Sequence, residues 1–239
     1  MGELRLYAIA IDDVRDMFGA PAETADRLRK LAADALRTAP KPARPQGLLG
    51  KLGPLLRRPA DAPVVPDGAP LPSDVDTLLA GRYVQPDRLA ACWQVVETWL
   101  EHESRGMLRV EMTPAGLEQV EFELARAGLA SDHALGRLMM GDARLGLRPA
   151  PGMRVGYAKN AHLVATAQAL RQCLDQVQQP VRERVEPVAD FLGSCELWSA
   201  APGTEARNDQ LHNGDQPLNG DGKQAGAPDL LAILDDAPR

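Results

Sequence analysis

The chain has 239 residues, of which 44% are hydrophobic and only 4% are aromatic, so alanine and aliphatic side chains must form most of the core. A net charge of −6 and an isoelectric point near 5.3 exclude the basic surface that nucleic-acid-binding domains need. No stretch approaches the roughly 20 consecutive apolar residues of a membrane-spanning helix. We therefore expect a globular protein that binds no nucleic acid.

The cellular location is inferred from the first residues and from the cysteines. The apolar run Leu4–Ile11 is too short for a secretory signal peptide and contains Arg5. Cys92, Cys173 and Cys195 form no CxxC pair and fall on apolar faces of predicted helices, where a free thiol behaves as a small hydrophobic side chain. Arginine outnumbers lysine by 22 to 5, which is typical of a high-GC bacterial genome. We expect a cytoplasmic bacterial protein.

The first predicted element is a strand. Residues Leu4–Ile11 are apolar on both faces except for Arg5, which indicates a central strand with both faces covered. Asp12 or Asp13 is expected to cap a short helix that ends at Gly19.

Further elements follow from hydrophobic spacing and from proline and glycine signals. Period-two patterns predict a half-exposed strand over 108–112 and another strand over 153–158. Helical spacing predicts helices over 21–36, 73–79, 86–105, 114–127, 133–140, 163–177 and 180–195, the last of them kinked or divided at Pro187.

These elements predict the class α+β, mainly helical, with a small three-stranded sheet covered by helices in a single domain over residues 1–200. Because the strands are separated by more than a dozen residues, we expect crossover connections between them and no hairpins.

A proline-rich excursion interrupts the domain over residues 39–72. Between Ala39 and Pro59 it has five basic residues and no acidic residue, and it contains an apolar, basic segment that we call the leucine island. The island consists of Leu48, Leu49, Lys51, Leu52, Leu55, Leu56, Arg57 and Arg58. Three interpretations remain open: a loop held to the domain by its leucines, a docking site for a protein partner, or association with a membrane surface. Glycines at 47, 50 and 53 disfavour a stable helix and so make membrane association unlikely.

The C-terminal part divides in two. Residues 201–228 are polar and rich in glycine, asparagine and aspartate, which predicts a flexible, disordered loop or tail. Residues 229–235 are apolar again, and we expect them to form a turn that docks back on the domain, in preference to a peptide that reaches for a partner.

No motif for catalysis, cofactor binding or metal binding is present. The glycines of Gly220–Gly226 have the wrong spacing for a phosphate loop and follow no predicted strand. His102 lies between two glutamates that must point in other directions on a helix, so no metal site is predicted there. We predict no cofactor and no metal, and an enzyme is the less favoured class.

The chain resembles an uncharacterised family of proteins from high-GC actinobacteria. The residues that carry the resemblance are Leu4–Ala20, Gly47–Pro59 and the run Leu147–Tyr157, and the polar insert 201–227 departs from it. The layout of a Met-Gly start, a first strand and then helices is also similar to that of YfbM-like bacterial proteins. Neither resemblance implies an activity or catalytic residues. By analogy, families of this kind include immunity or accessory proteins that bind a partner.

We therefore expect a non-enzymatic, protein-binding module of the immunity or accessory type, whose partner surface includes the leucine island. The alternative is a hydrolase or transferase of unrecognised type, with its site at the C-terminal ends of the first and last predicted strands. Asp12, Asp13, Arg15 and Lys159 are the polar residues nearest to those ends. A polar pocket at these strand ends is a requirement of the alternative.

Overall fold

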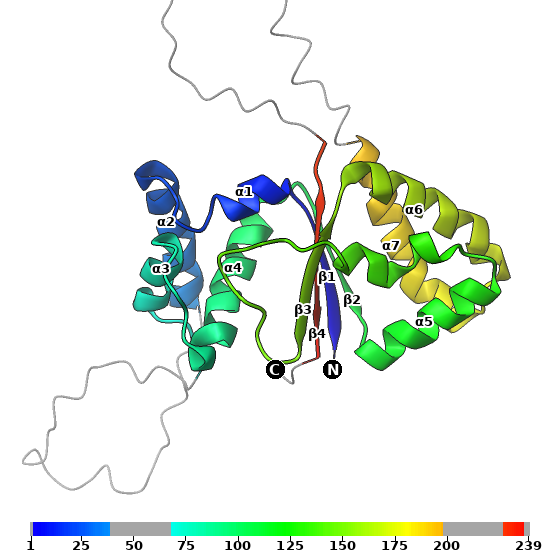
Figure 1. Ribbon diagram of the computed structural model, residues 1–239, viewed down its shortest axis with the longest axis horizontal. Coiled ribbons are helices and arrows are strands. Elements are labelled where there is room, and N and C mark those ends of the chain that lie inside the picture. Colours follow the sequence, from blue (N-terminus) through cyan, green and yellow to red (C-terminus); the bar gives the residue numbers. More distant parts are fainter. Residues whose placement is uncertain (1, 39–67, 198–226, 237–239) are drawn as a thin grey trace, which may run out of the picture.

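A four-stranded antiparallel sheet separates two layers of helices in the computed structural model, which describes residues 2–38, 68–197 and 227–236 (Figure 1). The order of the strands across the sheet is β2-β1-β4-β3. Their bounds are β1 Glu3–Ala8, β2 Met107–Glu111, β3 Met153–Ala158 and β4 Leu230–Asp235.

Strand β4 corrects two sequence predictions, because the sheet has four strands where three were expected and residues 230–235 are a strand where a docked turn was expected. All six residues of β4 are buried, and the strand lies between β1 and β3, with Leu6 and Gly156 both opposite Ala232. A short apolar run that is buried on both faces is typical of a central strand. Every pairing in the sheet is antiparallel, and the chain crosses from β2 at one edge of the sheet to β3 at the other, in line with the expected crossover connections.

The prediction of β1 as a central strand is confirmed, and its side chains alternate between the two helical layers. Leu4, Leu6 and Ala8 pack on the layer of α5, α6 and α7, whereas Tyr7 packs on the layer of α1–α4. This alternation divides the core into two apolar clusters, one on each face of the sheet.

The first layer consists of α5 (Pro114–Arg126), α6 (Asn160–Cys173) and α7 (Gln179–Leu197), drawn on the right in Figure 1. The predicted start of α5 is confirmed, since Thr113 Oγ1 accepts a hydrogen bond of 3.0 Å from Gly116 N. Pro187 lies inside α7, which continues through it undivided.

The second layer consists of α1 (Ile11–Arg15), α2 (Ala22–Thr38), α3 (Pro72–Leu79) and α4 (Leu89–Glu103), drawn on the left in Figure 1. Two buried tryptophans of α4 fix its position. Trp99 Nε1 donates to Leu28 O at 2.9 Å, and Trp93 Nε1 donates to Arg148 O at 2.8 Å. Each ring therefore packs with its polar N–H satisfied.

Local boundaries differ from the predictions in three places. Neither Asp12 nor Asp13 caps α1, whose N-cap is Ala10. The proline-rich excursion ends one residue earlier than expected, because Pro72 is already the first residue of α3. The helix expected over 133–140 is two short 3₁₀ turns, η3 (Ser131–His133) and η4 (Leu135–Met139). Two more 3₁₀ turns, η2 (Pro86–Arg88) and η5 (Leu174–Gln176), adjoin α4 and α6.

Candidate functional site

The ends of three strands meet at one edge of the sheet. Strands β1 and β3 both run antiparallel to β4, so their C-terminal ends lie beside the N-terminal end of β4, at the upper end of the sheet in Figure 1. Asp229 joins them. Its carbonyl accepts a hydrogen bond of 3.0 Å from Ile9 N, and its Oδ2 accepts from Lys159 Nζ at 2.8 Å and from Ile11 N at 3.4 Å. The carboxylate that stabilises the start of α1 thus comes from the far end of the chain.

Arg15 is held in place at this edge by three contacts. Its Nε donates to Ala143 O at 2.9 Å, and its Nη1 donates to Asp12 Oδ1 at 2.9 Å. The guanidinium carbon lies 5.8 Å from the centroid of the Tyr157 ring. A guanidinium fixed in this way has less conformational entropy to lose when it binds an oxyanion.

Next to Arg15 is an open hollow of about 540 Å³ lined by Arg15, Asp142, Arg144 and Tyr157, which we call the strand-end hollow. Arg144 has a positive φ of 47°, unusual for a residue with a side chain. The Asp142 side chain stabilises this turn, since its Oδ1 accepts a hydrogen bond of 3.0 Å from Arg144 N. Lys159 Nζ lies 5.6 Å from the centroid of the Tyr157 ring.

The charges around the strand-end hollow are paired. Lys159 binds Asp229, and this hydrogen bond raises the pKa of the Lys159 ammonium, which stays charged at neutral pH. Arg15 pairs with Asp12, and Arg144 Nε lies 3.5 Å from Asp142 Oδ2. Because the last pair is more than three-quarters exposed, it is weak and can exchange for a ligand.

No thiol of the described residues is suited to nucleophilic catalysis. All three cysteines are buried, and burial raises the pKa of Cys92 to about 12 and that of Cys195 to about 11. Within the same residues, no group of three or more His, Cys, Asp or Glu side chains could hold a metal ion. His133 and His162 stack on each other, and the Thr166 hydroxyl, which contacts both rings, is fully buried.

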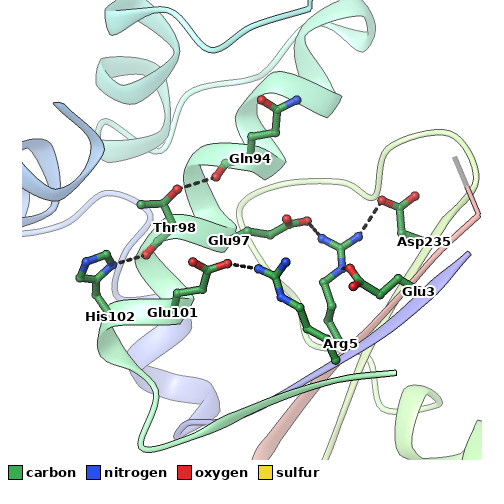
Figure 2. A network of polar contacts seen from close by, with 9 residues as sticks. Glu3, Arg5, Gln94, Glu97, Thr98, Glu101, His102 and Asp235 are labelled. Carbon is green, nitrogen blue, oxygen red and sulfur yellow. Dashed lines mark hydrogen bonds and ion pairs between the residues drawn. The ribbon is translucent and has the colours of Figure 1, made fainter. Parts of the chain in front are cut away.

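A second set of polar residues is buried between β1, β4 and α4 (Figure 2). Arg5 is fully buried and forms ion pairs with Glu97, with Asp235 at 2.6 Å and with Glu3 at 3.2 Å. Burial lowers the pKa of the Arg5 guanidinium, but Glu97 and Asp235 more than offset this effect, so the pKa lies above its usual value. Because Arg5, Glu97 and Asp235 are almost completely buried, we interpret the set as structural: it joins α4 to the first and last strands.

The structure brings together some of the residues that the sequence pointed to. Arg15 lines the strand-end hollow, Asp12 accepts a hydrogen bond from Arg15, and Lys159 lies beside the ring of Tyr157, another residue that lines the hollow. Asp13 instead lines a neighbouring groove of about 910 Å³ between α1, α2 and the end of α4. The leucine island, residues 48–58, lies outside the described residues.

The sequence patterns do not identify four residues of this edge as site residues: Tyr157, Asp142, Arg144 and Asp229. In the sequence analysis Tyr157 is only one residue of the predicted strand over 153–158. Asp229 directly precedes the apolar run that forms β4, but the sequence does not show that this run pairs with β1. Asp142 and Arg144 lie in a loop with no local pattern that indicates a site.

Together these features define a protein with an antiparallel sheet between two helical layers and an arginine-containing polar hollow at the strand ends. Residues 1–211 match the model of a family described as "Domain of unknown function (DUF7691)", and the chain belongs to this family. Strand β4 lies beyond the matched residues. No curated protein and no solved structure matches the chain. Within the part that the structure describes, no helix has the length and apolar character to cross a membrane.

Proposed function

We propose that the protein is a non-enzymatic binding module for a protein partner, and that the strand-end hollow receives a carboxylate of that partner. The observation that carries the proposal is the fixed Arg15 guanidinium, held by Ala143 O, Asp12 and the Tyr157 ring beside an open hollow. Arginine presents several N–H groups in one plane, a geometry that matches a carboxylate.

The openness of the hollow favours a macromolecule over a small molecule. The side chains of Asp142 and Arg144 at its rim are 78% and 81% exposed, and that of Lys159 is 61% exposed. Small-molecule sites bury most of their ligand's surface, and this shallow hollow does not. A protein partner can insert one acidic side chain here and make its other contacts on the surrounding surface.

The leucine island supports the same class of partner from the sequence. It is apolar and basic, so an acidic partner with an exposed apolar patch would complement it. Replacing Leu52, Leu55 and Leu56 together by serine should weaken partner capture and leave the melting temperature nearly unchanged. A large fall in melting temperature would show that these leucines belong to the core.

An immunity or accessory role, a cytoplasmic location, an actinobacterial origin and a distant likeness to YfbM-like proteins are parts of the same proposal. They rest on the sequence resemblance, on the high arginine content and on the three unpaired cysteines.

The experiment is affinity capture with the tagged full chain from extracts of the source organism, followed by binding measurements with the purified partner. Arg15→Met should weaken capture by about tenfold or more, because it keeps an unbranched apolar stem and removes the guanidinium. Arg182→Met, at a partly exposed arginine of α7, is the matched control and should bind like the wild type. Equal binding by all three proteins would refute a role for the hollow.

The alternative, a hydrolase or transferase of unrecognised type, has one observation in its favour: a polar hollow does lie at the predicted strand ends. Asp12 forms an ion pair with Arg15, and in such an enzyme the Asp12 carboxylate would act as the general base. Asp12→Asn should then abolish turnover in a screen of ester and phosphoester substrates. Under the binding proposal, the wild type itself shows no turnover in this screen.

A further inference from the structure

The two edges of the sheet differ. Strand β3 is covered along part of its outer edge by residues 139–141, since Tyr157 N donates to Gly141 O at 3.2 Å. This segment lies so close that a Cβ at Gly156 would be 2.0 Å from Met139 O. Strand β2, at the other edge, pairs with β1 alone among the described residues.

The register shows which backbone groups of β2 face outward. Ala8 N donates to Gly106 O and Met112 N donates to Gly2 O, both at 2.9 Å, so even-numbered residues form the hydrogen-bonded pairs between the two strands. The N–H and C=O groups of Met107, Arg109 and Glu111 must therefore point away from β1. No described residue bonds to them, and together they can accept another strand.

The side chains of this edge carry one charge of each sign. Arg109 and Glu111 are exposed on the face of β2 toward α4, where Arg109 also pairs with Glu101, whereas Leu108 and Val110 pack on the opposite face. A groove of about 440 Å³ runs between the edge and α7. An edge with charges of one sign repels its own copy, but an edge with both signs can pair with itself.

We propose that β2 pairs with β2 of a second copy of the chain, antiparallel about a two-fold axis at Val110, to form a continuous eight-stranded sheet. In this register each Arg109 lies opposite Glu111 of the other copy in a hydrogen-bonded pair, and the two Val110 residues face each other in a non-hydrogen-bonded pair. A shift of the axis to Arg109 would place two arginines opposite each other, which disfavours that register. Charge complementarity thus selects both the partner and the register.

The test is analytical ultracentrifugation of the full chain at several concentrations, together with charge variants of β2. The wild type should dimerise. Arg109→Glu and Glu111→Arg should each raise the dimer dissociation constant about tenfold or more, because each places like charges opposite each other twice. The double variant with both changes should recover dimerisation. Glu23→Lys, at an exposed position on α2, is the matched control and should dimerise like the wild type.

A second variant tests the register directly. Val110→Cys places two thiols at a Cα separation of about 4.5 Å across the axis, which a disulfide can span. Under mild oxidation this variant should form a covalent dimer. Arg109→Cys should form far less covalent dimer, because residue 109 lies opposite residue 111 of the other copy and the two new thiols do not face each other. The three native cysteines are buried and should not interfere with this cross-linking.

Two results would overturn the proposal. One is a wild type that stays monomeric up to millimolar concentration, and the other is a dimer whose dissociation constant neither single charge variant changes.

Discussion

Arg5 Nη2 donates a hydrogen bond of 2.6 Å to Asp235 Oδ2, so the first strand of the chain is joined to the last by a buried ion pair. Glu97 of α4 binds the same guanidinium from another side (Figure 2). One arginine therefore fixes three elements that are far apart in the sequence: β1, α4 and β4. The ion pairs of Arg5 with Glu97 and Asp235 specify how β1, α4 and β4 are arranged, although burying these charges costs free energy.

Arg5→Met should lower the free energy of unfolding by about 3–5 kcal/mol, because it leaves the carboxylates of Glu97 and Asp235 buried without their cation. Urea unfolding followed by circular dichroism measures this change. Arg182→Met removes two partly exposed ion pairs, with Asp175 and with Glu186, and should change stability by less than about 1 kcal/mol. A loss for Arg5→Met as small as that of the control would mean that the carboxylates find other partners or become protonated.

Sequence patterns predicted most elements because those elements have a regular period. The strand at Met153–Ala158 and the cap at Thr113 were placed correctly by alternation and by capping residues. Strand β4 was not predicted as a strand because five consecutive apolar residues after a long polar stretch show no alternation, and nothing local distinguishes a buried strand from a turn.

The strand-end hollow was predictable only in part. Asp12, Arg15 and Lys159 follow strands in the sequence, so they could be placed at strand ends. Asp229 reaches the same edge only because β4 inserts between β1 and β3, a pairing across more than 200 residues that no local pattern encodes. The arginine–tyrosine contact likewise depends on tertiary packing.

Tyr7→Phe should raise the free energy of unfolding by about 1 kcal/mol or leave it unchanged. The Tyr7 hydroxyl is buried and has no hydrogen-bond partner among the described residues. Burial, followed by the charge of Glu97, raises the pKa of the phenol, so the hydroxyl keeps its proton at all working pH values. Tyr83→Phe is the contrasting variant, because the Tyr83 hydroxyl accepts a hydrogen bond of 2.9 Å from Arg148 Nη2; at a residue that is 65% exposed, its loss should lower stability by less than about 1 kcal/mol. A loss of more than about 1 kcal/mol for Tyr7→Phe would indicate a bound water at the hydroxyl.

Gly156→Ala should destabilise the protein by about 1–3 kcal/mol, because the new methyl group would lie 2.0 Å from Met139 O and would push away the segment that covers β3. Gly193→Ala is its control. There the nearest atom is Nη2 of Arg171 at 2.4 Å, the end of a half-exposed side chain that can move, and alanine favours the helix by up to about 1 kcal/mol. Thermal unfolding of both variants compares them. Similar losses in both would show that the cover of β3 is not tightly packed.

His162, which is stacked on His133, should make stability depend on pH. His133 and His162 have ring centroids 5.8 Å apart, and the Thr166 hydroxyl lies 3.1 Å from Nδ1 of His133 and 3.5 Å from Nε2 of His162. Burial, followed by the charge of His133, lowers the pKa of His162 below its usual 6.5, and Arg137 lowers it slightly further. The folded state therefore binds fewer protons than the unfolded state just below pH 6.5. By linkage, stability should be constant above about pH 7 and should fall as the pH drops below 6.5, until it levels off below the folded pKa of His162.

Urea unfolding between pH 5.5 and 7.5 measures this dependence of stability on pH. His162→Gln should reduce the slope, whereas His102→Gln, at the exposed end of α4, should leave it as in the wild type. A slope that survives His162→Gln unchanged would assign the pH dependence to titratable groups other than His162.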